Sequence, residues 1–237
     1  MIAILRLSLA YYRRTHRWTA PLIVYVGAIL FIYSVVPNPV MESYAATSAL
    51  LFAMSVWTGF SYIDAEHPTH QALAALHGGG IRRYYIGRLL TGLSVVSILP
   101  SLFAVLYPLA GGKFERAATG LEILAALLGH AVLAALGLAV AVWFTNKLIA
   151  KHSHALLGLF LALSASLASQ SIAQELPGGA AALTWLLPPV RQTMQFLTER
   201  DHAQGTPSEW LIGIAWPAIY AAVMLTVYVG VLERKRF

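Results

Sequence analysis

The sequence has no cysteine and few charged residues. Without cysteine, no disulfide can form. Charged residues make up 11% of the 237 residues and hydrophobic residues 58%, whereas a soluble domain carries about 25% charged residues. The core of so short a chain cannot absorb this much apolar surface. The composition therefore excludes an ordinary soluble domain and indicates that lipid replaces water around much of the chain.

A phosphate-binding loop is also missing. Such a loop needs a glycine, four further residues and then Gly-Lys-Ser/Thr, so that backbone amides can cradle the phosphates. The Gly112–Lys113 pair is followed by Phe114, and Tyr107 stands where the first glycine belongs. The Gly78–Gly80 run is not a phosphate site either, because no strand precedes it. It indicates a turn. We therefore expect no ATP hydrolysis by this route and no cofactor on this chain.

Metal-binding and catalytic patterns are equally sparse. His67 and His70 form one pair, and His152 and His154 form another. A stable metal site needs three or four ligands in fixed geometry, so we expect none here. The apolar runs contain neither paired carboxylates nor a His-Glu-x-x-His motif.

Lys and Arg outnumber Asp and Glu, which gives a formal net charge of +6. An excess of this kind can indicate nucleic-acid binding, but here the basic residues sit at the ends of apolar runs. That placement is typical of membrane proteins, whose cytoplasmic loops are rich in Lys and Arg. We therefore expect a lipid bilayer as partner and no nucleic acid.

Six apolar runs without Lys, Arg, Asp or Glu are each long enough to cross a bilayer, which takes about 17–25 residues. The sequence thus predicts an all-α membrane protein with six transmembrane helices in a single transmembrane domain, 1–237. The runs are Ala20–Val36, Ala45–Ile63, Leu89–Leu109, Ile123–Phe144, Ala155–Ala173 and Trp210–Leu232.

The N-terminal segment, residues 1–18, is amphipathic and basic. Ile2, Leu5 and Leu9 fall near one helical face, and Arg13 and Arg14 add charge that suits membrane anchoring. This pattern favours a helix lying in the membrane interface. A basic leader that only sets the topology is the alternative.

The distribution of basic residues sets the orientation, because Lys and Arg favour the cytoplasmic side. With both termini in the cytoplasm of a multi-pass plasma-membrane protein, twelve basic residues lie inside and four outside. The inner residues are Arg6, Arg13, Arg14, Arg17, Arg82, Arg83, Arg88, Lys147, Lys151, Arg234, Lys235 and Arg236. The outer residues are Lys113, Arg116, Arg191 and Arg200.

The outer segment 174–209, between the fifth and sixth runs, is half-apolar. Its first half is broken by Pro188–Pro189 and is too interrupted to span the bilayer. We expect it to be re-entrant, as two short helices that dip into the outer leaflet and bury Trp185 and Phe196. An ordinary external loop with some apolar cover is the alternative.

The cytoplasmic loop 64–85 is the longest polar element between two runs. Pro68 can occupy the first turn of a short helix, with Asp64 and Glu66 at its positive end. Leu73 and Leu76 form an apolar face, and three glycines then stop the helix. Arg82 and Arg83 follow as a membrane anchor at the headgroups.

Buried polar and small residues mark the remaining candidates. His130 lies inside the fourth run, and an ionisable residue at that depth is a candidate pathway residue or a neutral imidazole that bonds a neighbouring helix. Small residues suited to close helix packing recur in the fifth run, for contact within the chain or with a second subunit. They are Gly158, Ala162 and Ser166, with Gln170 one turn further on.

The loop resembles that between the second and third spans of ABC-2 type transporter permeases. The resemblance rests on Glu66, Thr69 three residues later, Leu73 and Leu76, the glycine turn, and the run Gly87-Arg88-Leu89-Leu90. The chain departs from the family at Pro68, where a glycine is frequent. The overall plan, an interfacial helix followed by six spans, is similar as well.

This resemblance implies a permease subunit of an exporter, and not an enzyme. It would pair with a second permease, alike or different, and dock on ABC ATPase subunits that hold ATP and Mg²⁺. The implied docking residues are Glu66, Thr69, Leu73 and Leu76, on a cytoplasmic coupling helix. Since the runs carry no charge, we expect an amphiphilic or apolar cargo such as a drug, lipid or antimicrobial peptide.

Two other interpretations stay open. A membrane sensor or scaffold would use the same loop to bind a different partner. An intramembrane enzyme would be centred on His130.

Overall fold

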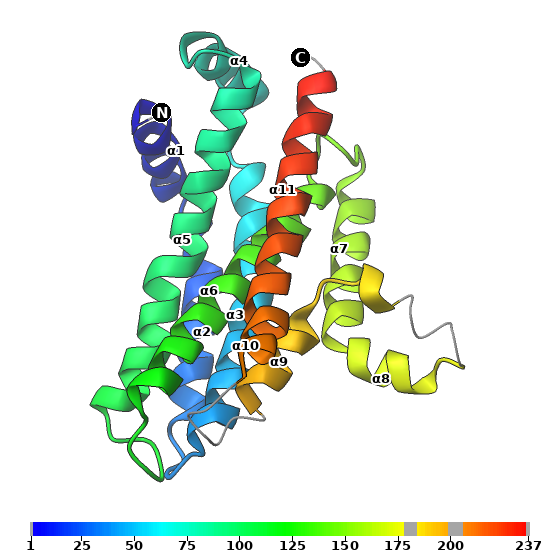
Figure 1. Cartoon of the computed structure of the whole chain (residues 1–237). Helices are drawn as coiled ribbons and strands as arrows, with labels where there is room; N and C mark the ends of the chain where they lie inside the picture. The colour runs from blue at the N-terminus through cyan, green and yellow to red at the C-terminus, as the bar shows by residue number, and fades with distance from the viewer. Residues whose placement is uncertain (1, 178–183, 199–205, 236–237) are drawn as a thin grey trace.

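The computed structural model describes residues 2–177, 184–198 and 206–235, which are helical apart from connections and one isolated bridge between Asn38 and Phe114. The prediction of an all-helical chain is confirmed for these residues (Figure 1). The helices are α1 (Ile2–Thr15), α2 (Thr19–Ile32), α3 (Val40–Ile63), α4 (Pro68–His77), α5 (Ile81–Ala110), α6 (Gly120–Ala141), α7 (His152–Leu167), α8 (Ser169–Glu175), α9 (Val190–Thr198), α10 (Pro207–Trp210) and α11 (Trp216–Arg234). A 3₁₀ turn, η1 (Val142–Phe144), ends α6, and a π-helical turn, η3 (Leu211–Ala215), joins α10 to α11.

Four continuous helical segments are long and apolar enough to cross a membrane: α3, α5, α6 with η1, and α10 through α11. Two further pairs qualify only as bent spans. The α1–α2 pair turns by 79° and the α7–α8 pair by 70°. The described chain therefore has four candidate spans, or up to six if each bent pair is one span.

The centre of the bundle is the contact between α3 and α6. Glycine permits the close approach, since a β-carbon at Gly137 would lie 2.6 Å from the carbonyl oxygen of Phe52. His130 lies in the same contact and is fully buried, with its Nε2 3.0 Å from the Thr47 hydroxyl and its Nδ1 2.7 Å from the Ala126 carbonyl. The Nε2 contact thus joins α6 to α3, whereas the Nδ1 contact stays within α6 and fixes the ring.

The described helices differ from the predicted runs at several ends, and two of these differences bear on the candidate residues. The third predicted run begins at Leu89, but α5 already begins at Ile81, directly after the glycine turn, and so includes the exposed Arg82 and Arg83 and the buried, paired Arg88. The fifth predicted run is not one straight helix, since α7 ends at Leu167 and α8 leaves at an angle of 70°. Gln170 lies beyond this bend and so does not continue the small-residue stripe of α7.

The segment before the last span is folded onto the bundle where it is described. In α9, Phe196 and Leu197 are buried against α3 and α6, and the Thr193 hydroxyl donates to the Gly213 carbonyl at 2.7 Å. Trp185 and Leu186 are exposed. Residues 178–183 and 199–205 of the predicted re-entrant segment lie outside the described residues.

Both termini, α4 and the connection between α6 and α7 lie at one end of the bundle (Figure 1). The α2–α3 and α5–α6 connections meet at the opposite end, where the backbone N–H of Asn38 donates to the Lys113 carbonyl at 3.0 Å. Most of the basic residues predicted to be cytoplasmic therefore share one end. Arg236 lies outside the described residues.

We expect Thr47 and His130 to stabilise the α3–α6 contact together. In a double-mutant cycle of Thr47→Val and His130→Leu, the coupling energy should be about 0.6–1.7 kcal/mol, the range for polar bonds between membrane helices. Thermal unfolding in mild detergent measures it. Strictly additive effects of the two substitutions would contradict a direct bond.

Candidate functional site

The short helix α4 is built as its sequence indicates. His67 caps its first turn, with Nδ1 accepting the Thr69 N–H at 3.4 Å, and Pro68 occupies the first helical position, where no amide is needed. Gly78 ends the helix, and Gly79 and Gly80 take φ values of +88° and +108°. Glycine adopts this left-handed region without strain. The predicted helix and its glycine stop are confirmed.

The two faces of α4 have different surroundings. Gln71 and Ala75 are buried on the side toward α5, with 3% of each residue exposed. Leu73 and Leu76 point outward, with 50% and 77% exposed, and Thr69 is exposed as well. The exposed face therefore carries the two leucines that the sequence assigns to docking.

Glu66 lies inside the fold. Only 6% of it is exposed, and one carboxylate oxygen accepts hydrogen bonds from both the Arg88 guanidinium and the Tyr84 hydroxyl. Its carboxylate therefore does not share the outer face of α4 with Leu73 and Leu76. The carboxylate is also not a free charge at the N-terminus of α4, because it forms an ion pair with Arg88. We assign Glu66 to supporting the helix from within.

Arg88 has a role in the structure that the sequence does not indicate. The sequence places it among the cytoplasmic basic residues, but only 1% of it is exposed. Its Nη2 donates to the carbonyls of Tyr62 at 3.0 Å and Ile63 at 2.8 Å, which are among the last carbonyls of α3. The spacing of Tyr84 and Arg88, four residues apart on one face of a helix, was the available signal.

We call Glu66, Tyr84, Arg88 and the two α3 carbonyls the inner clamp. Glu66 precedes α4, Tyr84 and Arg88 belong to α5, and the carbonyls end α3. The inner clamp thus fixes the start of α4 to the ends of two candidate spans. Taking both charges out of water costs several kcal/mol for each ion, so the pair is stable only because its hydrogen bonds are nearly complete.

A second set of contacts joins α4 through Tyr85 of α5 to the turn between α6 and α7. Gln71 Nε2 donates to the Glu66 carbonyl at 2.8 Å, and the Tyr85 hydroxyl donates to Gln71 Oε1 at 3.4 Å. Lys147, in the turn between α6 and α7, donates to the Tyr85 hydroxyl and lies 5.1 Å from the centre of its ring. Burial, and next the charge of Arg88, lowers the pKa of Lys147 to about 8.

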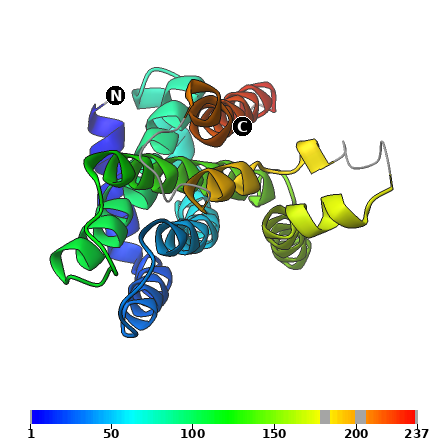
Figure 2. The same cartoon turned by 60° about the horizontal axis from the view of Figure 1, so that its bottom comes forward.

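A groove of about 810 Å³ lies between α2, α3 and α7. Figure 2 shows α7 (yellow-green) standing apart from α2 (blue), with α3 between them. The walls of the groove are mostly apolar and aromatic. They are Pro21, Val24, Tyr25, Ala28, Leu50, Ala53, Met54, Val56, Trp57, Phe60, Leu156, Leu159, Phe160 and Leu163.

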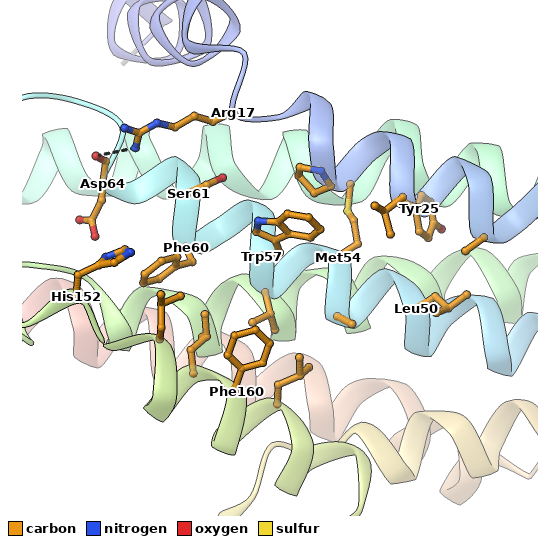
Figure 3. Close-up of a pocket in the computed structure, with 18 of the residues that line it drawn as sticks. Arg17, Tyr25, Leu50, Met54, Trp57, Phe60, Ser61, Asp64, His152 and Phe160 are labelled. Carbon is orange, nitrogen blue, oxygen red and sulfur yellow. Dashed lines mark hydrogen bonds between the residues drawn. The ribbon is translucent and has the colours of Figure 1, made fainter. Parts of the chain in front are cut away.

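The polar lining of the groove gathers at one end, beside α1 and the start of α7 (Figure 3). We call Arg17, Ser61, Asp64, Asn146 and His152 the groove mouth. The groove is therefore lined by apolar side chains along its length and by polar side chains at one end. This distribution complements an amphiphilic molecule.

Asp64 joins three chain segments at this mouth. Its Oδ2 accepts the Asn146 N–H at 2.9 Å, and its carbonyl accepts Arg17 Nη1 at 3.4 Å. Burial raises the pKa of the Asp64 carboxyl, against the lowering effect of the Asn146 N–H and the charge of Arg88. The elbow between α1 and α2, the end of α3 and the α6–α7 turn are thus held together by two hydrogen bonds.

The other predicted residues lie away from the groove. His130 is enclosed between α3 and α6 and does not line it. In the stripe of α7, Gly158 faces the Phe144 ring, where a β-carbon would lie 2.7 Å from the ring edge, and Ser166 is buried with its hydroxyl bonded to the Ala162 carbonyl. At Gly158 the stripe therefore packs within the chain. Gln170 is exposed on α8.

The predicted anchoring arginines are all exposed. Arg13 and Arg14 end α1, and Arg82 and Arg83 begin α5. Membrane anchoring by these four side chains stays a prediction. Among the described residues, no group of three His, Cys, Asp or Glu could hold a metal ion.

We expect the inner clamp to behave as a coupled unit. Arg88→Met should destabilise the protein by about 3–5 kcal/mol, because it leaves Glu66 buried without a partner. Adding Glu66→Leu should restore part of this loss but not all, because the Tyr62 and Ile63 carbonyls still lack their donor. Thermal unfolding in detergent gives the comparison.

Arg82→Met on the exposed side of the same helix is the matched control and should change stability by no more than about 0.5 kcal/mol. Equal effects of Arg88→Met and Arg82→Met would refute the clamp.

Comparison of the chain with family models, with curated proteins and with solved structures gives no match in any of the three. The geometry of α4, the inner clamp and the groove therefore carries the functional argument.

Proposed function

We propose that this chain is the membrane-spanning permease subunit of an ATP-driven exporter of the ABC-2 type. In this proposal α2 and the bent α7–α8 pair are the two further spans, so that the chain crosses the plasma membrane six times with both termini in the cytoplasm. Residues Ile2–Thr15 lie in the interface, and the region around α9 inserts partly into the outer leaflet. The carrying observation is α4, whose exposed leucines are braced from inside by a buried ion pair.

The bracing of α4 is what suits it to docking. A helix tied only by surface contacts would yield when a partner pushed on it. Here Glu66 and Gln71 are bonded to residues of α5, and Arg88 also holds the end of α3. A load applied at Leu73 and Leu76 would thus reach two spans directly. This supports α4 as a coupling helix, with ATP and Mg²⁺ held by the partner ATPase.

The groove supports an amphiphilic or apolar cargo. Its apolar wall follows α3 from Leu50 to Phe60, roughly 15 Å at the rise of an α-helix. This length suits an alkyl chain or a flat aromatic body, while the groove mouth suits a polar head. A second permease subunit, alike or different, would cover the open side of the groove between α2 and α7.

A sensor or scaffold would also present α4 to a partner, but without dependence on ATP. An enzyme centred on His130 is less well supported, because both ring nitrogens are already bonded within the bundle. The scaffold gives a different outcome from the permease in the next experiment.

Replacing Leu73 and Leu76 by Asp should abolish docking. Full burial of each leucine contributes roughly 1.5–3 kcal/mol, so each substitution should weaken ATPase retention by about tenfold or more. The measurement is co-purification of the tagged chain with the cell's ATPases in mild detergent, followed by ATP turnover of the complex.

The double variant Leu73→Met and Leu76→Met is the matched control and should retain the ATPase. A well-folded wild-type chain that binds no ATPase would overturn the permease proposal. A bound protein without ATP turnover would favour the scaffold.

Trp57→Ala tests the groove. Loss of this aromatic wall should weaken binding of a dansyl-labelled fatty acid by about tenfold, because burial of an aromatic side chain contributes roughly 1.5–3 kcal/mol. Dansyl fluorescence on titration of the purified protein measures the affinity. Trp185→Ala, at an exposed tryptophan outside the groove, should leave the affinity unchanged. Equal weakening by both substitutions would exclude the groove as the binding site.

A further inference from the structure

The connection from α3 to α4 is held on two sides. On the inner side, Arg88 binds the carbonyls of Tyr62 and Ile63 and the carboxylate of Glu66. On the outer side, Asp64 binds the Asn146 N–H and Arg17. Since Asp64 lies between Ile63 and Glu66, the same short stretch of chain belongs to the inner clamp and to the groove mouth.

The two sides differ in strength. The inner clamp is buried and includes an ion pair with several hydrogen bonds. The outer contacts are solvent-exposed: one hydrogen bond from the Asn146 N–H and one long hydrogen bond from Arg17. Solvent-exposed polar contacts contribute little to stability. A displacement of the α3–α4 connection would therefore break the outer contacts first and leave the clamp intact.

A second route links α4 to the same place. Gln71 on α4 bonds to Tyr85, and Tyr85 accepts a hydrogen bond from Lys147. Lys147 is adjacent to Asn146, the partner of Asp64. The turn between α6 and α7 is thus reached from α4 both through Tyr85 of α5 and through Asp64. This turn leads directly into α7, one wall of the groove.

We infer that Asp64 is a positioning residue that joins α4 to the groove mouth. Its contacts hold the end of α3 against the α6–α7 turn and the α1–α2 elbow, and so keep the mouth narrow. A shift of α4 moves the α3–α4 connection, releases Asn146 and Arg17 from Asp64, and lets α7 move away from α2. Entry into the groove from the aqueous side then becomes easier.

The inference rests on the proposed function in one respect, that an ATPase supplies the push on α4. We call the contacts of Asp64 with Asn146 and Arg17 the latch. The latch can be tested without any ATPase. Because the chain has no cysteine, a single cysteine at Leu156, a groove residue one turn beyond His152 on α7, can be labelled specifically. The probe is a membrane-impermeant, charged maleimide added to membranes with the mouth exposed to the probe.

Asp64→Ala should raise the labelling rate of Leu156→Cys by about fivefold, the factor that corresponds to one typical hydrogen bond. Asp64→Asn retains an oxygen that can accept the Asn146 N–H and should label like the parent. Glu115→Ala removes a carboxylate at the opposite end of the bundle and should also label like the parent. Gln71→Leu, which frees α4 from Tyr85 while Asp64 is unchanged, should raise the rate as well.

Equal labelling rates in the Asp64→Ala and Glu115→Ala backgrounds would overturn the latch. A raised rate with Asp64→Ala but not with Gln71→Leu would overturn the link to α4. Should Asp64→Ala fail to fold, as judged by gel filtration, Asp64→Ser takes its place, since serine is too short to reach the Asn146 amide. The absence of a co-purifying ATPase would remove the proposed function but leave these labelling results unaffected.

Discussion

The ion pair between Glu66 and Arg88 determines how the predicted cytoplasmic end of this protein is assembled. Two charges buried at this depth are tolerated only with nearly complete hydrogen bonding. Tyr84 and the carbonyls of Tyr62 and Ile63 supply those bonds. The end of α3, the start of α4 and the first turns of α5 must therefore keep one relative arrangement, because any other leaves a buried charge or carbonyl without a partner.

This constraint explains why α4 can present an apolar face. A ten-residue helix is too short to be stable alone in water. Its inner side is held by Gln71, Ala75 and the neighbouring clamp. The exposed leucines on its outer side are therefore not needed to hold the helix in place. Leu73 and Leu76 can then remain exposed at a solvent-facing end. Exposed leucines on a braced helix indicate a partner surface more strongly than leucines on a mobile loop, because binding need not order the helix again.

Features that depend on neighbouring residues in the sequence could be predicted, and features that depend on tertiary pairing could not. Helix α4 followed from Pro68 and the glycine stop, and the candidate spans followed from the apolar runs. The burial of Arg88 could not be predicted, because nothing in the neighbouring sequence shows that Glu66 will neutralise it. The bend after Leu167 and the packing of Gly158 on Phe144 likewise depend on contacts between distant elements.

The groove and its mouth are stabilised by different forces. Binding of a ligand would depend on the apolar walls, and access to the groove would depend on the polar mouth. Along α2, α3 and α7 the walls are apolar, and contacts between apolar side chains have little directional preference, so these helices can shift against lipid or cargo at low cost. At the mouth, the bonds of Asp64 with Asn146 and Arg17 do depend on direction and are lost after a small displacement. Any motion that starts at α4 meets this polar end before it reaches the apolar walls. In the proposed exporter, the connection between α3 and α4 would therefore control access to the groove, and the helices beyond it would set the volume available to a cargo.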